Sequence, residues 1–214
     1  MSYAVMWSGG KDSALSLWRA RAAGLEVSCL ITLYDRESGR VRFHGTRIDV
    51  IARQAVAAGL PLRALPTSWP DMDRDLRAVL ASLRAAGFRG VIFGDIHLAD
   101  VRSWYEERVT AADLEHVEPL WGERPGDLLA EFVRIGGRAV ITCCELARLD
   151  DSWLGRLIDE SFLDDVALTG VDPCGENGEY HSFAVAGPMF SYPLSPHLGR
   201  RRIQDGFAQV DVLL

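Results

Sequence analysis

The chain has 214 residues, of which 48% are hydrophobic and 25% charged, and its formal net charge is −7. This length suits one large domain or two small ones with a full hydrophobic core. The negative charge argues against an extended nucleic-acid surface, which is usually basic. No apolar run approaches the roughly 20 residues of a membrane helix. No signal peptide is visible and the four cysteines form no C-x-x-C pair, so we expect a cytoplasmic protein with reduced thiols.

Apolar segments alternate with amphipathic ones over the first 120 residues. The first strand is predicted over residues 3–7, and the first helix over residues 12–23, ended by Gly24. The same patterns predict further strands over 26–34, 62–65, 90–93 and 115–118, and further helices over 48–58, 71–86 and about 102–113. Strands that alternate with helices predict an α/β fold with a doubly wound parallel sheet.

The pattern changes after Trp121, where Gly-Glu-Arg-Pro-Gly at 122–126 has the composition of a boundary. Beyond it we predict a helix over 127–135, a strand over 138–144 and a helix over 152–162. A segment rich in Gly, Glu, Asn and His follows at 171–183. The chain is therefore predicted to have two domains, residues 1–124 and a smaller mixed α/β domain over residues 125–214.

Lysine and asparagine are almost absent. The chain contains one lysine, Lys11, against 22 arginines, and one asparagine, Asn177. This composition is typical of a GC-rich genome in which arginine replaces lysine wherever charge alone suffices. Because Lys11 was kept, we infer that it needs a compact point charge, as in contact with a phosphate group.

The segment Ser8-Gly9-Gly10-Lys11-Asp12-Ser13 follows the first strand and opens the first helix. Paired glycines let the backbone present N–H groups to an oxyanion, and a helix N-terminus favours negative charge. We expect Lys11 and the two serine hydroxyls to bind the phosphates of ATP, and Asp12 to orient the loop or help to hold Mg²⁺. The spacing differs from that of a Walker A motif.

Two other loops follow strands of the same predicted sheet. They contain Gly94-Asp95 and the residues 43–47. In parallel sheets ligands bind at the carboxyl ends of the strands. We therefore expect these loops and residues 8–13 to lie at one edge and to form one site.

The 8–13 loop resembles the PP-loop of the N-type ATP pyrophosphatases. Further motifs narrow the resemblance to one family. They are Gly94-Asp95 with Tyr105, Glu106 and Arg108, the segment Glu118-Pro119-Leu120-Trp121, and the segment Gly175-Glu176-Asn177-Gly178-Glu179-Tyr180-His181-Ser182-Phe183. Together these are similar to the diphthine–ammonia ligase family and its bacterial relatives, over most of the chain. The resemblance implies an adenine nucleotide alpha hydrolase-like fold for residues 1–124 and a substrate-binding role for residues 125–214.

The resemblance also implies a reaction. Members of this family use ATP with Mg²⁺ to adenylate the carboxylate of diphthine, and ammonia then displaces AMP to form an amide. Diphthamide occurs in archaea and eukaryotes, so a bacterial relative would use another small-molecule or protein-borne carboxylate. In that scheme Gly94 and Asp95 are expected to contact the nucleotide, and Tyr105 the substrate.

The segment 175–183 is the second candidate site. Glu176 and Glu179 are expected to orient an amine, ammonia or a Mg²⁺-bound water, and His181 to bind a charged substrate group. Asn177 suits a left-handed or hydrogen-bonding turn that faces the substrate. The alternative is a structural hairpin turn.

His44 and Arg47 are candidates for contact with substrate or nucleotide, although a lone loop histidine is often simply exposed. Asp95 is equally well explained as a helix cap. No His, Cys or Asp cluster has the spacing of zinc ligands.

Three hypotheses about the function therefore remain open. The first is an ATP-dependent amide-forming ligase. The second is a nucleotide-binding protein of the same fold without turnover, and the third is tRNA thiolation, which expects a catalytic cysteine pair and a basic face. The apolar C-terminal residues 212–214 allow a homodimer contact, but burial within the monomer explains them equally well.

Overall fold

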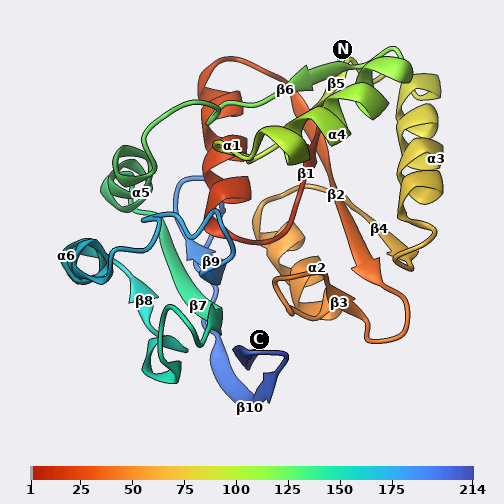
Figure 1. Ribbon diagram of the computed structural model, residues 1–214. Helices are drawn as coiled ribbons and strands as arrows, with labels where there is room; N and C mark the ends of the chain where they lie inside the picture. Colours follow the sequence, from red (N-terminus) through yellow and green to blue (C-terminus); the bar gives the residue numbers. More distant parts are fainter. Residues whose placement is uncertain (1) are drawn as a thin grey trace.

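The structure, a computed structural model, describes residues 2–214 and contains two sheets with their helices (Figure 1). Sheet A contains the strands β1 (Tyr3–Met6), β2 (Val27–Asp35), β3 (Arg40–Val41), β4 (Leu62–Thr67), β5 (Gly90–Ile92) and β6 (Glu115–Val117). Its helices are α1 (Lys11–Ala22), α2 (Ile48–Ala57), α3 (Met72–Ala85) and α4 (Ala99–Ala111).

Sheet A is parallel except for the short strand β3. Strand β1 lies between β2 and β5, β6 pairs with β5, and β4 pairs with the other edge of β2. Only β3 runs antiparallel to its neighbour, β2. The carboxyl ends of β1, β2 and β5 therefore meet at one edge, as the predicted fold requires.

Helices cover both faces of sheet A because its strand residues alternate between two cores. Tyr3 and Val5 pack with α1 and α2, whereas Ala4 packs with α3 and α4. Ile92 and Val91 on β5 divide in the same way. The prediction of a doubly wound parallel sheet is thus confirmed.

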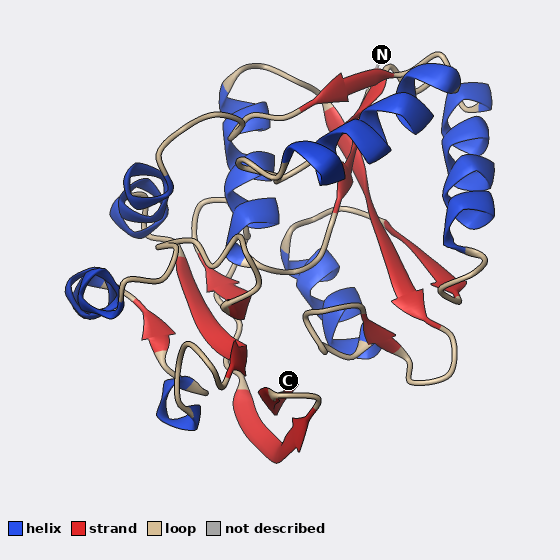
Figure 2. Ribbon diagram, viewed as in Figure 1, coloured by secondary structure: helices blue, strands red, loops and turns tan. Residues whose placement is uncertain are grey.

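Sheet B is antiparallel and follows in the second half of the chain (Figure 2). Its strands are β7 (Arg138–Glu145), β8 (Leu157–Ile158), β9 (Tyr180–Ala186), β10 (His197–Gln204) and β11 (Phe207–Leu213). The accompanying helices are α5 (Pro125–Arg134), the 3-10 turn η1 (Asp151–Trp153) and α6 (Glu160–Thr169).

The two halves share a hydrophobic core. Leu15 of α1 belongs to the same buried cluster as Leu129 of α5 and Phe183 of β9. Arg19 joins the halves by polar contacts as well, because its guanidinium pairs with Glu123 and Glu131. The second half is therefore packed against the helix that begins at the glycine turn.

The helix predicted over residues 152–162 is wrong. Gly155 adopts a φ of +85° after η1, and β8 follows it. The acidic residues beyond it begin α6, where Asp159 caps the helix by accepting a hydrogen bond from the Phe162 N–H at 3.1 Å. Negative charge is favoured at a helix N-terminus, which explains why this acidic run starts a helix.

The β10–β11 hairpin was not predicted, and it explains part of the apolar C-terminus. Val212 is buried in the monomer core, whereas Leu213 is half exposed. Dimerisation remains a prediction.

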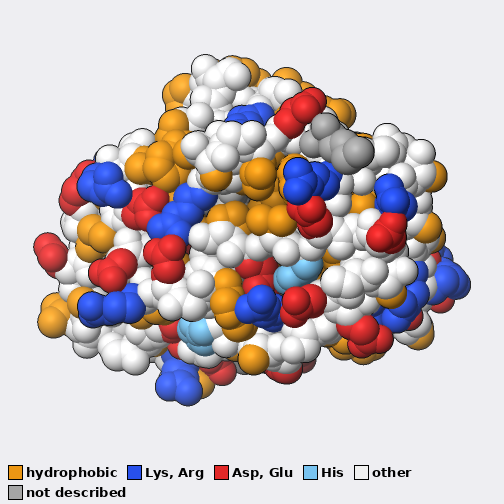
Figure 3. Space-filling model, turned by 90° about the horizontal axis from the view of Figure 1, so that it is seen from above, with side chains coloured by type: hydrophobic (Ala, Val, Ile, Leu, Met, Phe, Trp, Pro, Cys, Tyr) orange, Lys and Arg blue, Asp and Glu red, His pale blue; other side chains and the backbone are white. Residues whose placement is uncertain are grey.

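The surface is mixed in charge. On the face shown in Figure 3, acidic and basic side chains are interspersed and small apolar areas lie between them. Within residues 2–214 no helix combines the length and apolar character needed to cross a bilayer.

Candidate functional site

The loop between β1 and α1 turns sharply at Gly9, whose φ is +84°, a conformation that other residues rarely adopt. A Cβ atom there would collide with Ile51 and lie 2.8 Å from Oε1 of Gln54. The buried Gln54 side chain holds the turn. Its Nε2 donates to the carbonyl groups of Gly9 (2.9 Å) and Ala184 (2.7 Å), and its Oε1 accepts from Trp7 (2.8 Å).

Strand β9 from the second half lies along the same loop. The Ala184 N–H donates to the carbonyl of Gly9 at 2.8 Å, and the Lys11 N–H donates to Oγ of Ser182 at 3.2 Å. Both halves of the chain therefore position the glycine turn.

The first turn of α1 is open to an anion. Gly10 is the N-cap residue and has no side chain to cap the helix, while Ser182 accepts from the N–H of Lys11, the first residue of α1. Oγ of Ser8 accepts from the Gly10 N–H at 3.2 Å and lies 3.3 Å from Oγ of Ser13, which donates to the Gly10 carbonyl at 3.0 Å. The N–H groups of a first helical turn and the helix dipole favour phosphate binding, so this loop fits the phosphate chain of a nucleotide.

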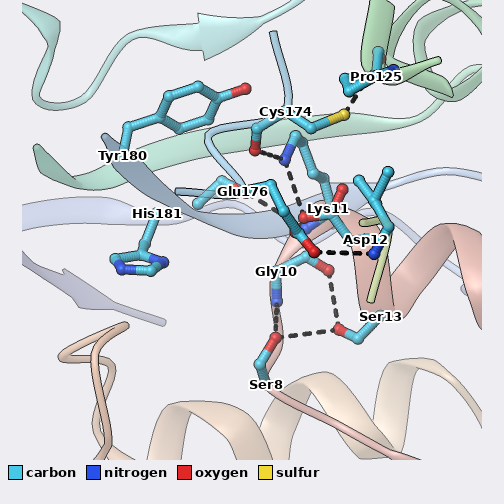
Figure 4. Close-up of polar contacts among 12 residues, drawn as sticks. Ser8, Gly10, Lys11, Asp12, Ser13, Pro125, Cys174, Glu176, Tyr180 and His181 are labelled. Atoms are coloured by element: carbon cyan, nitrogen blue, oxygen red, sulfur yellow. Dashed lines mark hydrogen bonds and ion pairs between the residues drawn. The ribbon is translucent and has the colours of Figure 1, made fainter. Parts of the chain in front are cut away.

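Lys11 is a buried cation at this helix N-terminus, with only 3% of the residue exposed. Its Nζ donates to Oδ2 of Asp12 at 2.9 Å and to the carbonyl of Cys174, and it lies 5.1 Å from the ring centre of Tyr180 (Figure 4). Burial by itself would lower the pKa of Lys11, but Asp12, with Tyr180 and Cys174, raises it well above its usual value. Lys11 is therefore positively charged.

Strand β5 meets the loop at Gly94. A Cβ atom on Gly94 would lie 3.0 Å from the backbone nitrogen of Ser13 and 3.1 Å from the carbonyl carbon of Asp12. The next residue, Asp95, has its pKa raised to about 6 by burial and by the charge of Asp12. The loops at 8–13 and 94–95 are thus in direct contact.

Glu176 reaches the same place from the second half. Its Oε1 accepts a hydrogen bond from the Ile96 N–H at 2.8 Å. Figure 4 shows the side chains of Lys11, Asp12 and Glu176 converging above the glycine turn. Burial, and then the charge of Asp12, raise the pKa of Glu176 to about 8, so this carboxyl is mostly protonated at neutral pH.

Glu179 and Asn177 hold the loop that carries Glu176. Oε1 of Glu179 accepts from the Asp172 N–H (3.1 Å) and from Nδ2 of Asn177 (3.2 Å), and Oε2 accepts from the Asn177 N–H (3.1 Å). Asp172 in turn accepts from the Cys174 N–H at 2.7 Å. Glu179 and Asn177 thus act on loop shape in this structure. The catalytic role of Glu179 and the substrate contact of Asn177 stay predictions.

The rings of His44 and His181 contact each other beside the turn, with ring centres 4.5 Å apart and planes tilted by 45°. A Cβ atom on Gly10 would lie 3.2 Å from Cε1 of His44. Burial, and then the charge of Lys11, lower the pKa of His44 to about 4, while burial and His44 lower that of His181 well below its usual value. Both imidazoles are neutral, and within residues 2–214 Nδ1 of His44 has no hydrogen-bond partner. A substrate could therefore hydrogen-bond to His44.

Arg47 and Tyr105 make their contacts away from the glycine turn. Arg47 is half exposed, pairs with Asp49 at 3.0 Å and lines a surface hollow of about 300 Å³. Tyr105, on α4, packs against Phe93 with ring centres 4.9 Å apart, and burial raises its pKa. Substrate contact by either residue remains a prediction.

Sequence reasoning missed Gln54, Ser182 and Asp172. Gln54 is the one polar residue on the buried face of α2 within the described chain, and a buried glutamine usually has a specific hydrogen-bonding task. That pattern could have identified it. Ser182 and Asp172 belong to the segment singled out at 171–183, but their contacts depend on the fold of that loop.

Asp12 is the residue best placed to hold a magnesium ion. Across residues 2–214 no group of three or more His, Cys, Asp or Glu side chains is arranged to hold a metal ion alone. Mg²⁺ is usually bound by one or two carboxylates together with substrate phosphates and water. The carboxylate of Asp12, 26% exposed at the helix N-terminus, suits that arrangement only when a phosphate ligand is present.

The adjacent cysteines are poorly suited to catalysis. Cys143 and Cys144 are both buried, and burial raises the pKa of each thiol to about 11. A nucleophilic cysteine needs a thiolate and hence a lowered pKa. This geometry argues against tRNA thiolation.

Comparison with known proteins agrees with the motifs. Family models of the diphthamide synthase N-terminal and C-terminal domains match residues 1–113 and 124–211. The chain is 29% identical to the human diphthine–ammonia ligase, 27% to the bovine protein and 28% to the rat protein. Each alignment covers 89% of this chain and 80% of the relative. The resemblance inferred from the motifs is therefore confirmed, and the chain belongs to the diphthamide synthase family.

Proposed function

We propose that the chain is an ATP-dependent ligase that adenylates a carboxylate and joins it to ammonia, releasing AMP and pyrophosphate. Its family and the names of its mammalian relatives support this proposal. The observation that carries it is Lys11, the sole lysine of the chain, buried and charged at the N-terminus of α1, where the N-cap residue is a glycine.

ATP would bind with its phosphates at that helix N-terminus. Lys11, the first N–H groups of α1 and the hydroxyls of Ser8 and Ser13 would neutralise the charge that builds up on the leaving pyrophosphate. Mg²⁺ would supply further positive charge to the phosphate oxygens, with Asp12 as its protein ligand. Gly94, which allows β5 to touch the helix, and Asp95 would line the nucleotide side of the site.

The reaction has two bond exchanges. A carboxylate oxygen of the acceptor attacks the α-phosphorus of ATP, and pyrophosphate leaves. Ammonia then attacks the activated carbonyl carbon, AMP leaves, and the nitrogen loses a proton. Glu176, with a pKa of about 8, is suited to exchange a proton near neutral pH.

The acceptor would enter between the two halves. The neutral rings of His44 and His181 offer hydrogen bonds to a polar acceptor group, and the half-exposed Arg47 would meet it further out. The relatives act on diphthine by name; for this chain we propose a small-molecule or protein-borne carboxylate. In this scheme residues 1–124 would bind the nucleotide and residues 125–214 the substrate. The four buried, unpaired thiols support a cytoplasmic location.

A nucleotide-binding protein without turnover is the second candidate. One observation favours it: Nζ of Lys11 is already held by Asp12 and by the Cys174 carbonyl. Both contacts would have to loosen before the ammonium could follow a leaving pyrophosphate.

The two candidates differ in the fate of the α-phosphate. Incubation with ATP labelled at the α-phosphate, with and without candidate acids and ammonium, should yield labelled AMP only when acid is present. Lys11→Met should abolish this product, whereas Arg124→Lys, at an 88% exposed side chain, should leave it unchanged. ATP that is bound but stays uncut with every acid would support the second candidate instead.

A further inference from the structure

A second polar cluster lies at the carboxyl edge of sheet A, beyond the phosphate loop. Strands β5 and β6 are parallel neighbours, so the residues that follow them, Asp95 and Glu118, lie at the same edge. Strand β1, which leads into the loop, is the other neighbour of β5. Glu118 is thus two strand spacings, roughly 10 Å, from the end of β1.

Glu118 is buried without a hydrogen bond. Its side chain is 3% exposed, and among residues 2–214 no donor is directed at either carboxylate oxygen. Nε of Arg102 lies 3.0 Å from Oε2 but is itself unpartnered, so the two form an ion pair with poor hydrogen-bond geometry. Nε2 of His116, 3.4 Å from Oε1, is likewise without a partner in the described chain. Buried polar atoms that lack hydrogen-bond partners in this way indicate a binding site for a small hydrogen-bonding ligand.

The charges of the cluster favour a monovalent cation. The charge of Asp95 acts on Glu118, and on this buried side the guanidinium of Arg102 pairs with Glu118. Burial lowers the pKa of His116, so this ring is neutral and leaves a lone pair or an N–H at Nε2. Glu106, 3.6 Å from Arg102, is on the solvent side and 46% exposed. One negative charge at the buried side therefore lacks a compensating cation within residues 2–214.

We propose that Glu118, His116 and Asp95 bind an ammonium ion and supply ammonia to the adenylated carboxylate. The second half of this inference rests on the proposed ligase function. Ammonium is small, carries one positive charge and donates hydrogen bonds in several directions, as the lysine head group does. Oε1 of Glu118, Nε2 of His116 and the carboxylate of Asp95 can accept them.

Glu118 acts as the base that converts ammonium into ammonia. One N–H bond of ammonium breaks and an O–H bond forms on Glu118, so the nitrogen regains its lone pair. Burial, and then the charge of Asp95, raise the pKa of Glu118 to about 7, which makes it a stronger base than an ordinary carboxylate. Ammonia then attacks the activated carbonyl carbon, the bond to AMP breaks, and the nitrogen loses one more proton to become the amide. The proton on Glu118 returns to solvent.

Direct binding tests the site without any turnover. Ammonium chloride titrated into the protein in a calorimeter should give saturable heat, whereas potassium chloride at equal ionic strength should not. Glu118→Gln keeps the shape but removes the charge and should weaken ammonium binding at least about 10-fold. Glu106→Gln, a matched change on the exposed side of Arg102, should leave it unaltered.

Absence of ammonium-specific binding in the wild type would overturn the proposal, and would mean that water or the ion pair alone satisfies the cluster. Equal binding by Glu118→Gln would overturn it as well. If Glu118→Gln does not fold, His116→Phe is a second test of the site. A phenyl ring can keep the ring contact with Phe93, whose ring centre is 4.7 Å away. It should weaken ammonium binding too, and an unchanged affinity would contradict the assigned site.

The ligase assay separates this inference from the function on which it rests. If acid-dependent AMP forms and Glu118→Gln raises the KM for ammonium at least about 10-fold while the KM for ATP is unchanged, both stand. Acid-dependent AMP with an unchanged ammonium KM would remove the ammonium site and leave the ligase. Ammonium binding through Glu118 without AMP formation would remove the ligase and leave the binding site.

Discussion

Gly94 offers a sharp test of how β5 positions the phosphate loop. In Gly94→Ala the added Cβ would lie 3.0 Å from the Ser13 nitrogen, 3.1 Å from the Asp12 carbonyl carbon and 3.2 Å from its oxygen. All three are backbone atoms of the first turn of α1, which cannot rotate out of the way as a side chain can. Overpacking of this kind costs about 1–3 kcal/mol, so the variant should fold but with the helix N-terminus displaced.

Two measurements follow for this variant. Urea unfolding should show the loss of about 1–3 kcal/mol, and calorimetry should show Mg-ATP affinity reduced at least about 10-fold. Gly126→Ala is the matched control, because its Cβ would meet nothing within 4 Å and alanine favours the helix α5. Wild-type ATP affinity in Gly94→Ala would refute the idea that this contact shapes the nucleotide site.

Three further substitutions test the surroundings of the loop. The pKa of Glu176 is about 8 in the folded protein and near 4.5 in the unfolded chain, so the folded state holds an extra proton between these values and loses stability as the pH rises through them. The stability of Glu176→Gln relative to the wild type should therefore increase from pH 5 to pH 8, by about 4 kcal/mol at most. A difference in urea midpoint between variant and wild type that is the same at both pH values would contradict this. Glu179→Gln removes an acceptor for loop N–H groups and should cost about 1–3 kcal/mol in urea unfolding, and an unchanged midpoint would show that the loop does not need the carboxylate. Gln54→Leu removes the side-chain donor to the carbonyl groups of Gly9 and Ala184, so it should lower both stability and ATP affinity. Normal ATP binding in a destabilised variant would show that this support of the turn is not needed for nucleotide binding.

Much of the fold could be predicted because its patterns are local. Strands and helices alternate in the first half, and a glycine ends three of the four helices. These patterns are visible in the sequence and appear in sheet A and its helices. The helix predicted over 152–162 was wrong because these residues are compatible with either a helix or a turn followed by a strand. The left-handed conformation of Gly155 produces the turn. The β10–β11 hairpin escaped prediction because its exposed arginines hide the alternation of a strand.

The candidate site was predictable in part for a related reason. Lys11 and its glycine turn are contiguous, so a motif can reveal them. The support from Gln54 and Ser182 comes from distant segments that only the fold brings to the loop. Glu179 is a residue type that often acts in catalysis, so the sequence suggested that role. Only its contacts show that it accepts hydrogen bonds from the backbone of its own loop and holds the shape of that loop.

Titration of Mg-ATP into the wild-type chain and into Lys11→Arg tests the nucleotide site most directly. The wild type should bind saturably, and the variant at least about 10-fold more weakly, because a guanidinium cannot occupy the enclosed space between Asp12 and the Cys174 carbonyl as a compact ammonium does. A wild-type chain without saturable binding, or an arginine variant with near-native affinity, would contradict the role assigned to the single lysine.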